Sequence, residues 1–182
     1  MNGVQIIGLV ILCIVAIGAI VTLWIFIVLL FTRVPYVKTP KKNIDLLLKK
    51  IPFTKNDRVY DLGCGDAEVL IEIDKRVGAQ TRGFEISPFA YLRAWLAVKS
   101  SGAKTRVWFK NFRKADISDA THIFVFLIPS VMQKTADWLE HNVAKGTLII
   151  SYGFSFPNKT PEQTIETDKR AHFASKFFVY RF

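Results

Sequence analysis

Asp61-Leu62-Gly63-Cys64-Gly65-Asp66-Ala67 is the stretch that decides the fold of this 182-residue chain. It completes a short β-branched and aromatic run, RVYDLG, and it opens a segment with helical apolar spacing, AEVLIEIDKRV. Glycines in this position permit a tight turn and a close approach of the backbone to a ligand. The stretch therefore predicts a strand, a ligand-binding turn and a helix, in that order.

The segments that follow alternate between strand and helix patterns. TRGFEI and TRVWFK are typical of strands, and PFAYLRAWLAVKSSG between them is typical of a helix. The nearly all-apolar HIFVFLI predicts a strand buried on both faces, followed by a helix from Ser130 to Asn142 and the strand GTLIISYGF. EQTIETD and SKFFVYRF predict a terminal antiparallel hairpin. The chain is thus expected to form an α/β fold with a Rossmann-like, seven-stranded sheet and helices on both faces.

An acidic residue, Glu85, ends the second predicted strand about twenty residues after the turn, where nucleoside-binding folds place an acceptor for ribose hydroxyls. Dinucleotides and S-adenosylmethionine share this arrangement. Carboxylates at Asp61 and Asp66 would repel a pyrophosphate at the helix N-terminus. They would instead attract the ammonium group of a sulfonium-bearing amino acid. The turn therefore favours S-adenosylmethionine as the cofactor over nicotinamide or flavin cofactors.

The first 32 residues have a different composition. Ile6 to Phe31 is almost wholly apolar, and none of the chain's 40 charged residues precedes Arg33. The run exceeds the roughly 20 residues that a helix needs to cross a bilayer. A cleavable signal peptide is the alternative, but a basic n-region is missing and the apolar run is too long. We expect an uncleaved transmembrane helix that binds the lipid bilayer through residues 6–31.

Basic residues crowd the other flank of this apolar run, at Arg33, Lys38, Lys41, Lys42, Lys49 and Lys50. Because positive flanks stay inside, the remainder of the chain is expected on the cytoplasmic or equivalent matrix side of the membrane. Three parts follow: a transmembrane anchor at 1–32, a basic linker with a first amphipathic helix at 33–56, and a cofactor-binding domain at 57–182.

The net charge of +10 suits an anionic membrane surface or an acidic partner, and it equally suits simple solubility. The basic and aromatic residues from Arg106 to Arg113 fit a strand and its loop better than a nucleic-acid site, so nucleic acid is not an expected partner. The two cysteines, Cys13 and Cys64, provide neither a disulfide framework nor a metal site. The tryptophans of the predicted domain, Trp95, Trp108 and Trp138, are expected in the core or in seams between helices and sheet.

DLGCGD followed by GFEISP resembles motifs I and II of class I S-adenosylmethionine-dependent methyltransferases. More narrowly, VPYVKTP, VYDLGCGD, GFEISP and ISDATHIFVFLIPSVM, which lie between about Val34 and Phe154, resemble the small membrane-anchored protein-lysine methyltransferases related to the mitochondrial ATP synthase c-subunit lysine methyltransferase. This resemblance implies a methyltransferase sheet with its last strand antiparallel, S-adenosylmethionine as cofactor, and a lysine side chain of a protein as acceptor.

The resemblance also implies the residues of the site. Those for the cofactor are Asp61, Gly63, Cys64 and Gly65 at the methionine half, Glu85 at the ribose, Ile86 and Asn111 at the adenine, and Thr39 in a segment that closes over it. Tyr36 in that segment is the one candidate for assisting catalysis, and the acceptor nitrogen would enter along Phe126, Leu127, Ile128 and Pro129. Related sequences usually read Gly-Asp-Gly-Arg where this chain has Gly65-Asp66-Ala67-Glu68, so a glycine is lost and a charge is reversed.

Methyl transfer to an amine requires alignment of nitrogen, methyl and sulfur, and it requires a neutral nitrogen. Because lysine ordinarily titrates near 10.4, an apolar channel lined by Phe124, Phe126 and Ile128 is expected to lower its pKa by desolvation. We therefore expect a membrane-tethered methyltransferase that acts on a lysine of a membrane-associated protein. Two alternatives remain open: methylation of a lipid or lipophilic small molecule, and a non-catalytic, nucleoside-binding membrane scaffold, which the Ala67-Glu68 departure supports.

Overall fold

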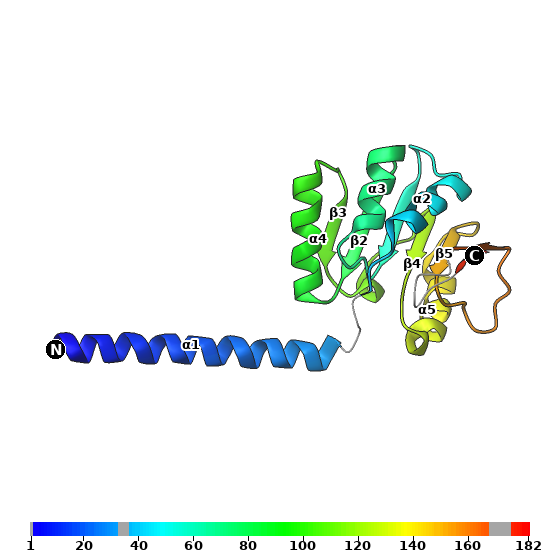
Figure 1. The fold of residues 1–182 in the computed structure, drawn as a ribbon. Coiled ribbons are helices and arrows are strands. Elements are labelled where there is room, and N and C mark those ends of the chain that lie inside the picture. The colour runs from blue at the N-terminus through cyan, green and yellow to red at the C-terminus, as the bar shows by residue number, and fades with distance from the viewer. Residues whose placement is uncertain (1, 33–36, 168–175) are drawn as a thin grey trace. The chain divides into compact units, whose positions relative to one another are not determined.

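The computed structural model describes residues 2–32, 37–167 and 176–182, and the chain divides into two compact units, Met1–Pro35 and Tyr36–Phe182 (Figure 1). The first unit contains one helix, α1 (Gly3–Thr32), of 30 residues. Its Gly3–Ile27 portion has a mean hydropathy of 3.1 and none of it is buried. At 1.5 Å per residue the helix is roughly 45 Å long. By length and composition it is able to cross a membrane.

The second unit is built on one seven-stranded sheet. In chain order the strands are β1 (Arg58–Leu62), β2 (Gln80–Glu85), β3 (Arg106–Phe109), β4 (His122–Val125), β5 (Leu148–Tyr152), β6 (Gln163–Glu166) and β7 (Lys176–Arg181). Across the sheet they are ordered β3-β2-β1-β4-β5-β7-β6, and β7 runs antiparallel to both of its neighbours. The predicted Rossmann-like sheet with an antiparallel last strand is confirmed. Two residues of the predicted terminal hairpin, Asp168 and Ser175, lie outside the described residues.

Helices cover both faces of this sheet, as predicted. They are α2 (Lys41–Lys50), α3 (Glu68–Val77), α4 (Pro88–Ser101) and α5 (Pro129–Asn142), with a short 3-10 helix η1 (Phe112–Lys114). Successive side chains of a strand point to opposite faces. Val59 and Phe124 accordingly pack into one core with α2, α3 and α4, whereas Tyr60 and Ile123 pack into a second core with α5.

The helices that follow β1 and β2 have clear local signals at their ends. Ser87 caps α4 by accepting a hydrogen bond from the Ala90 N–H, and Pro88 occupies the first turn, where its missing N–H costs nothing. Gly78 and Gly102 end α3 and α4 in the left-handed conformation that glycine adopts readily. Ser87 and Pro88 mark where the turn after β2 ends and α4 begins, at the carboxyl edge of the sheet. Gly78 and Gly102 lie at the opposite edge, where the chain returns to β2 and β3.

One boundary differs from the predicted one. The pairing of β4 with β5 ends at Val125 opposite Ser151, so residues 126–128 leave the sheet instead of extending the strand. Apolar composition alone predicted a longer strand, but the loop to α5 takes up the last three apolar residues. The consequence is that residues 126–128 of the predicted acceptor segment form a loop at the carboxyl edge, and Pro129 begins α5.

Candidate cofactor site

The turn after β1 is tied to the end of β2 by backbone hydrogen bonds. The N–H groups of Gly63 and Cys64 both donate to the Phe84 carbonyl oxygen, at 2.9 and 3.0 Å. Gly63 has a φ of +95°, a left-handed conformation that favours glycine, and a Cβ there would lie 3.1 Å from Leu127 Cδ2. The turn is therefore held against β2 on one side and against the predicted acceptor segment on the other.

Gly83 in β2 makes this close approach possible. A Cβ on Gly83 would lie 2.7 Å from Cys64 Sγ and 2.8 Å from Cys64 Cβ, which no side chain tolerates without movement. Cys64 is buried, and burial raises the pKa of its thiol well above the ordinary value, so the thiol stays protonated. Its N–H and its carbonyl oxygen are both used within the structure, the latter by the Ala67 N–H at 2.7 Å. Cys64 thus shapes the turn by packing.

Glu85 links the two turns that follow β1 and β2. Its Oε2 accepts the Gly65 N–H at 2.9 Å, and its Oε1 accepts the N–H groups of Ile86 at 2.8 Å and Ser87 at 2.7 Å. A carboxylate offers about four acceptor positions. One position on Oε2 therefore remains for a ribose hydroxyl without the loss of a backbone contact. Glu85 positions both turns as well as being the expected ribose ligand.

Asp61 has the electrostatic environment of a cation site. The side chain is buried, and its Oδ1 has no hydrogen-bond partner among the described residues. Desolvation raises the pKa of this carboxyl well above the ordinary value, and the charges of Glu85 and Asp66 raise it further. A buried carboxyl with an unused acceptor is stabilised by a positive partner. The ammonium group of an amino-acid ligand fits this requirement.

Binding of S-adenosylhomocysteine, which carries the same ammonium group, is expected to release a proton from Asp61. Burial raises the pKa of Asp61 in the free protein, whereas the ammonium group favours the carboxylate and so lowers this pKa in the complex. Affinity should therefore rise with pH between the pKa of the bound state and that of the free state. Isothermal titration calorimetry in two buffers of different ionisation enthalpy measures the proton count. Unchanged proton release in Asp61→Asn would contradict the assignment.

The same shift has a consequence for the stability of the free protein. Because the folded pKa of Asp61 lies above the ordinary 3.8, the unfolded chain gives up this proton first. The contribution of Asp61 to the free energy of unfolding therefore falls as pH rises from about 3.8 toward the folded pKa. Asp61→Asn should remove this decline, as urea titrations across that pH range would show, while it weakens ligand binding.

The predicted adenine residues lie on the same edge of the sheet. Ile86, directly after Glu85, is 56% exposed, as expected of an apolar side chain that packs against the adenine ring of a bound ligand. Asn111 lies two residues beyond Phe109, which pairs with Glu85 across β2 and β3. Its Oδ1 accepts the Arg113 N–H at 3.0 Å and so caps η1. The structure brings both residues to the edge where the turns meet.

The Val37–Pro40 segment contacts the turn through a residue that the sequence reasoning missed. Lys38 Nζ lies 2.8 Å from Glu68 Oε2 and 3.6 Å from Asp66 Oδ2. These contacts, with the Glu68 hydrogen bond first, raise the pKa of Lys38 against the smaller opposing effect of burial. Thr39 beside it is buried, whereas Tyr36 lies outside the described residues. The reversed charge at Glu68 was the sequence feature that could have identified Lys38, because a carboxylate at this position favours a cationic partner.

Lys38 and Glu68 are expected to contribute jointly to cofactor binding, because their pair holds the Val37–Pro40 segment on the turn. In a double-mutant cycle with Lys38→Met and Glu68→Gln, each single variant should weaken S-adenosylhomocysteine binding a few fold, as exposed ion pairs contribute about 0.2–1 kcal/mol. The double variant should be no weaker than either. Strictly additive losses would show that the pair does not act as a unit.

The lost glycine at position 67 also has a structural explanation. Ala67 precedes α3 with a φ of 60° and a ψ of 17°, in the left-handed region, and its side chain is fully buried. Such a conformation costs a non-glycine residue roughly 1–2 kcal/mol. The departure from the usual Gly-Asp-Gly-Arg pattern therefore leaves the turn geometry in place at some cost in stability.

The predicted acceptor segment lies next to the turn. Leu127 is the residue that faces Gly63, and Phe126 packs on Tyr152 with ring centroids 4.7 Å apart. Phe126, Leu127 and Ile128 are partly buried and Pro129 is exposed. Phe124, which was expected to line the channel, is instead 2% exposed and packs on Phe177 in the core, because it still belongs to β4. Of the residues predicted to line the channel, only those beyond the end of the strand remain available for that role.

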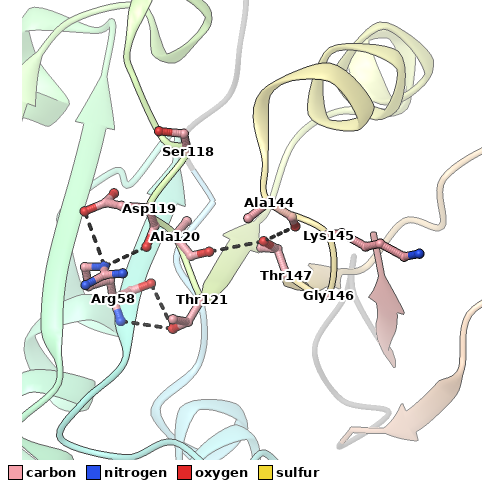
Figure 2. A pocket seen from close by; sticks show the side chains of 9 residues that line it. All are labelled: Arg58, Ser118, Asp119, Ala120, Thr121, Ala144, Lys145, Gly146 and Thr147. Carbon is pink, nitrogen blue, oxygen red and sulfur yellow. Dashed lines mark hydrogen bonds and ion pairs between the residues drawn. The ribbon is translucent and has the colours of Figure 1, made fainter.

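A surface pocket of about 290 Å³ lies at the opposite edge of the sheet (Figure 2). Its lining residues begin or precede β1, β4 and β5, so they mark the amino ends of these strands. Arg58 there donates through Nε to the Asp119 carbonyl oxygen at 2.6 Å and pairs with the Asp119 carboxylate at 3.3 Å. Ligands of parallel α/β sheets bind at the carboxyl ends of the strands. This pocket is therefore separate from the cofactor site.

The strand order, the glycine turn after β1 and the acid after β2 together define a class I S-adenosylmethionine-dependent methyltransferase. Residues 61–163 match the ANTKMT methyltransferase domain. A protein-lysine N-methyltransferase of Saccharolobus islandicus (strain REY15A) is 31% identical over 139 residues, which is 75% of this chain and 86% of that protein. The chain therefore belongs to the ANTKMT family of protein-lysine methyltransferases.

Two further comparisons agree with this assignment. The ATP synthase c-subunit lysine N-methyltransferase of Homo sapiens is 26% identical over 164 residues, which is 88% of this chain and 69% of that protein. The crystal structure of an RNA methyltransferase from Salinibacter ruber in complex with S-adenosyl-L-homocysteine has a TM-score of 0.74 and 28% identity, and the match covers 80% of this chain and 93% of that one. The expected enzyme class and the cofactor, S-adenosylmethionine, are confirmed.

Proposed function

We propose that this chain is a membrane-anchored enzyme that methylates a lysine side chain of a membrane-associated protein. The observation that carries the proposal is the joining of a lysine-methyltransferase domain to the uncharged Gly3–Ile27 helix. The human relative is named for the ATP synthase c-subunit, a membrane protein. An enzyme held in the bilayer meets acceptors in the same bilayer at a raised effective concentration.

By its composition the chain divides, in our proposal, into an anchor at 1–32, a linker and first helix at 33–56, and the methyltransferase domain at 57–182. The positive residues beyond the anchor favour a catalytic domain on the cytoplasmic or matrix side. Extraction of membranes with alkaline carbonate tests the anchor. The full chain should remain in the membrane pellet, and its release into the supernatant would count against a spanning helix.

Within the domain, we assign Asp61 to the ammonium group, Glu85 to the ribose, Ile86 and Asn111 to the adenine, and Gly63, Cys64 and Gly65 to the shape of the turn. Thr39 holds the segment that closes over the ligand. The bound cofactor supplies an electrophilic methyl group on a positively charged sulfur. The residues of the chain supply alignment, since positioning of the reactants can lower the barrier by about 7–11 kcal/mol.

The acceptor lysine has to lose its proton before it attacks. Phe126, Leu127 and Ile128 offer apolar walls beside the turn, and desolvation between such walls lowers the pKa of an amine. No carboxylate is required to take the proton, because a lysine whose pKa is lowered gives it to water. We retain Tyr36 as the candidate for assisting this step.

Methyl transfer can be tested with the full chain in liposomes, S-adenosylmethionine carrying a labelled methyl group, and membrane extracts. Label should appear in protein and, after acid hydrolysis, in methylated lysine. Label in the organic phase would instead assign a lipid or lipophilic small molecule as acceptor. Ligand binding with no transfer to either phase would support the scaffold alternative. Glu85→Gln serves as the inactive control.

A further inference from the structure

Helix α4 carries its large apolar side chains on the side that faces away from the sheet. Its inward positions are small, with Ala90 5% and Ala94 0% exposed. Its outward positions include four large apolar side chains, with exposed fractions of 43% to 52%: Phe89, Leu92, Trp95 and Leu96. A surface helix ordinarily shows the reverse arrangement, with its polar side toward water. These four residues are named here the outer face of α4.

The outer face of α4 is continuous and has a neighbour on the sheet. Leu92, Trp95 and Leu96 follow the i, i+3, i+4 spacing that places side chains on one side of a helix. Phe109 at the end of β3 is 57% exposed, and its ring lies 5.6 Å from that of Tyr91 in α4. β3 is the edge strand of the sheet, and α4 lies beside it at the end of the domain (Figure 1). A contiguous exposed apolar patch of this kind marks an interaction surface.

The charged side chains of the segment that carries this patch are all positive. Residues 86–115, which contain α4, β3 and the loops at their ends, include no Asp or Glu and seven cations: Arg93, Lys99, Lys104, Arg106, Lys110, Arg113 and Lys114. On α4 itself, Lys99 Nζ lies 5.0 Å from the centre of the Trp95 ring. This segment therefore combines exposed leucines and aromatic rings with cations and has no carboxylate of its own. The carboxylates of Asp74 and Glu85 accept backbone hydrogen bonds from it at the two ends of α4.

We propose that the outer face of α4 lies on the surface of a bilayer that contains anionic lipids. Leu92 and Leu96 would enter the region between headgroups and acyl chains, Trp95 would lie at the interface, and Arg93 and Lys99 would meet lipid phosphates. Apolar insertion combined with attraction to anionic headgroups is how amphipathic helices bind membrane surfaces, and tryptophan is enriched at that interface.

A bilayer fits these observations better than a nucleic acid or a second copy of the chain. A nucleic acid offers phosphates without an apolar layer in which leucines are buried. A second copy would place one uniformly positive surface against another, which repels. The proposal rests on the proposed anchor only for proximity to lipid, and it is independent of the identity of the methyl acceptor.

The test uses the full chain in liposomes whose acyl chains carry bromine, which quenches nearby tryptophans. Because Trp24 lies in α1, the signal of Trp95 is taken as the difference between the chain and its Trp95→Phe variant. Trp95 should be quenched in vesicles of phosphatidylcholine with phosphatidylglycerol, and less in phosphatidylcholine alone or at raised salt, which screens the charges. Trp95 emission unaffected by brominated lipid in anionic vesicles would overturn the proposal.

Paired variants separate insertion from general charge. The double variant Leu92→Gln, Leu96→Gln should abolish the quenching of Trp95. The double variant Arg93→Gln, Lys99→Gln should reduce it in part. Lys134→Gln with Lys145→Gln removes two exposed cations elsewhere and should leave the quenching unchanged. All three double variants should bind S-adenosylhomocysteine as tightly as the unchanged chain does, which would show that they fold.

Two other results would assign the face to a different occupant. A chain that sediments as a dimer in detergent, and as a monomer with Leu92→Gln and Leu96→Gln, would overturn the proposal in favour of self-association. A change of Trp95 emission on addition of RNA, with none on addition of anionic lipid, would overturn it in favour of nucleic acid. Failure of carbonate extraction to retain the chain concerns α1 alone and is distinguishable from both.

Discussion

Glu85→Gln is expected to weaken S-adenosylhomocysteine binding by about 10- to 100-fold, because a hydrogen bond to a charged group contributes about 1.5–3 kcal/mol. Methyl transfer should fall to background. The Glu85 carboxylate now accepts hydrogen bonds from the N–H groups of Gly65, Ile86 and Ser87. In the variant, the NH₂ group of the amide would replace one acceptor oxygen and would face a backbone donor. An unsatisfied buried donor costs about 1–3 kcal/mol, so the free energy of unfolding should fall as well.

Calorimetry measures the binding change, and urea titration measures the change in stability. Glu162→Gln is the matched control, since Glu162 is exposed and pairs with Arg181 at 3.4 Å far along the chain from the site. It should leave binding and stability nearly unchanged. Normal binding by Glu85→Gln would remove this residue from the cofactor site and leave it only its role in joining the turns.

Gly83→Ala is expected to have the largest effect on the fold of the site. The new methyl group would overlap Cys64 Sγ and Cβ and would also lie 2.8 Å from Leu70 Cδ1. Overpacking of a buried position costs about 1–3 kcal/mol and occasionally more. The overlap should push the turn after β1 away from β2, so ligand affinity should fall together with stability in urea titrations.

Two further variants test whether overlap with Cys64 is the cause of the lost affinity. Gly78→Ala changes another glycine, which has a φ of +79° and open space around a Cβ, so it should lower stability without lowering ligand affinity. Adding Cys64→Gly to Gly83→Ala removes both cysteine contacts and should recover part of the affinity. Equal losses of affinity in Gly78→Ala and Gly83→Ala would mean that close packing of the turn is not the cause.

Local features were predicted well from the sequence. The turn from Asp61 to Ala67, the acid at Glu85 and the alternation of strands and helices each depend on a few neighbouring residues. They therefore predicted the sheet and favoured S-adenosylmethionine as the cofactor. The resemblance of the same motifs to class I methyltransferases implied the enzyme class and a methyltransferase sheet with an antiparallel last strand. The length and composition of the Gly3–Ile27 helix were equally readable.

The errors came from side chains whose surroundings are set by distant segments. Phe124 was expected in the acceptor channel, but it belongs to β4 and packs on Phe177 of β7. Trp95 was expected in a seam between helix and sheet, yet it is 43% exposed. A helical pattern does not specify which side faces the sheet when both sides carry apolar residues, as in α4.

The sequence by itself determined the kind of sheet and the cofactor that it binds, because turn chemistry, strand patterning and charge at a helix start act within a few residues. Only the tertiary structure decided how the site is closed and what lies around it. Lys38 meets Glu68 across 30 positions, Gly83 makes room for Cys64, and Leu92, Trp95 and Leu96 of α4 are exposed. Such contacts depend on packing between elements, and packing is settled only when the whole sheet and its helices are in place.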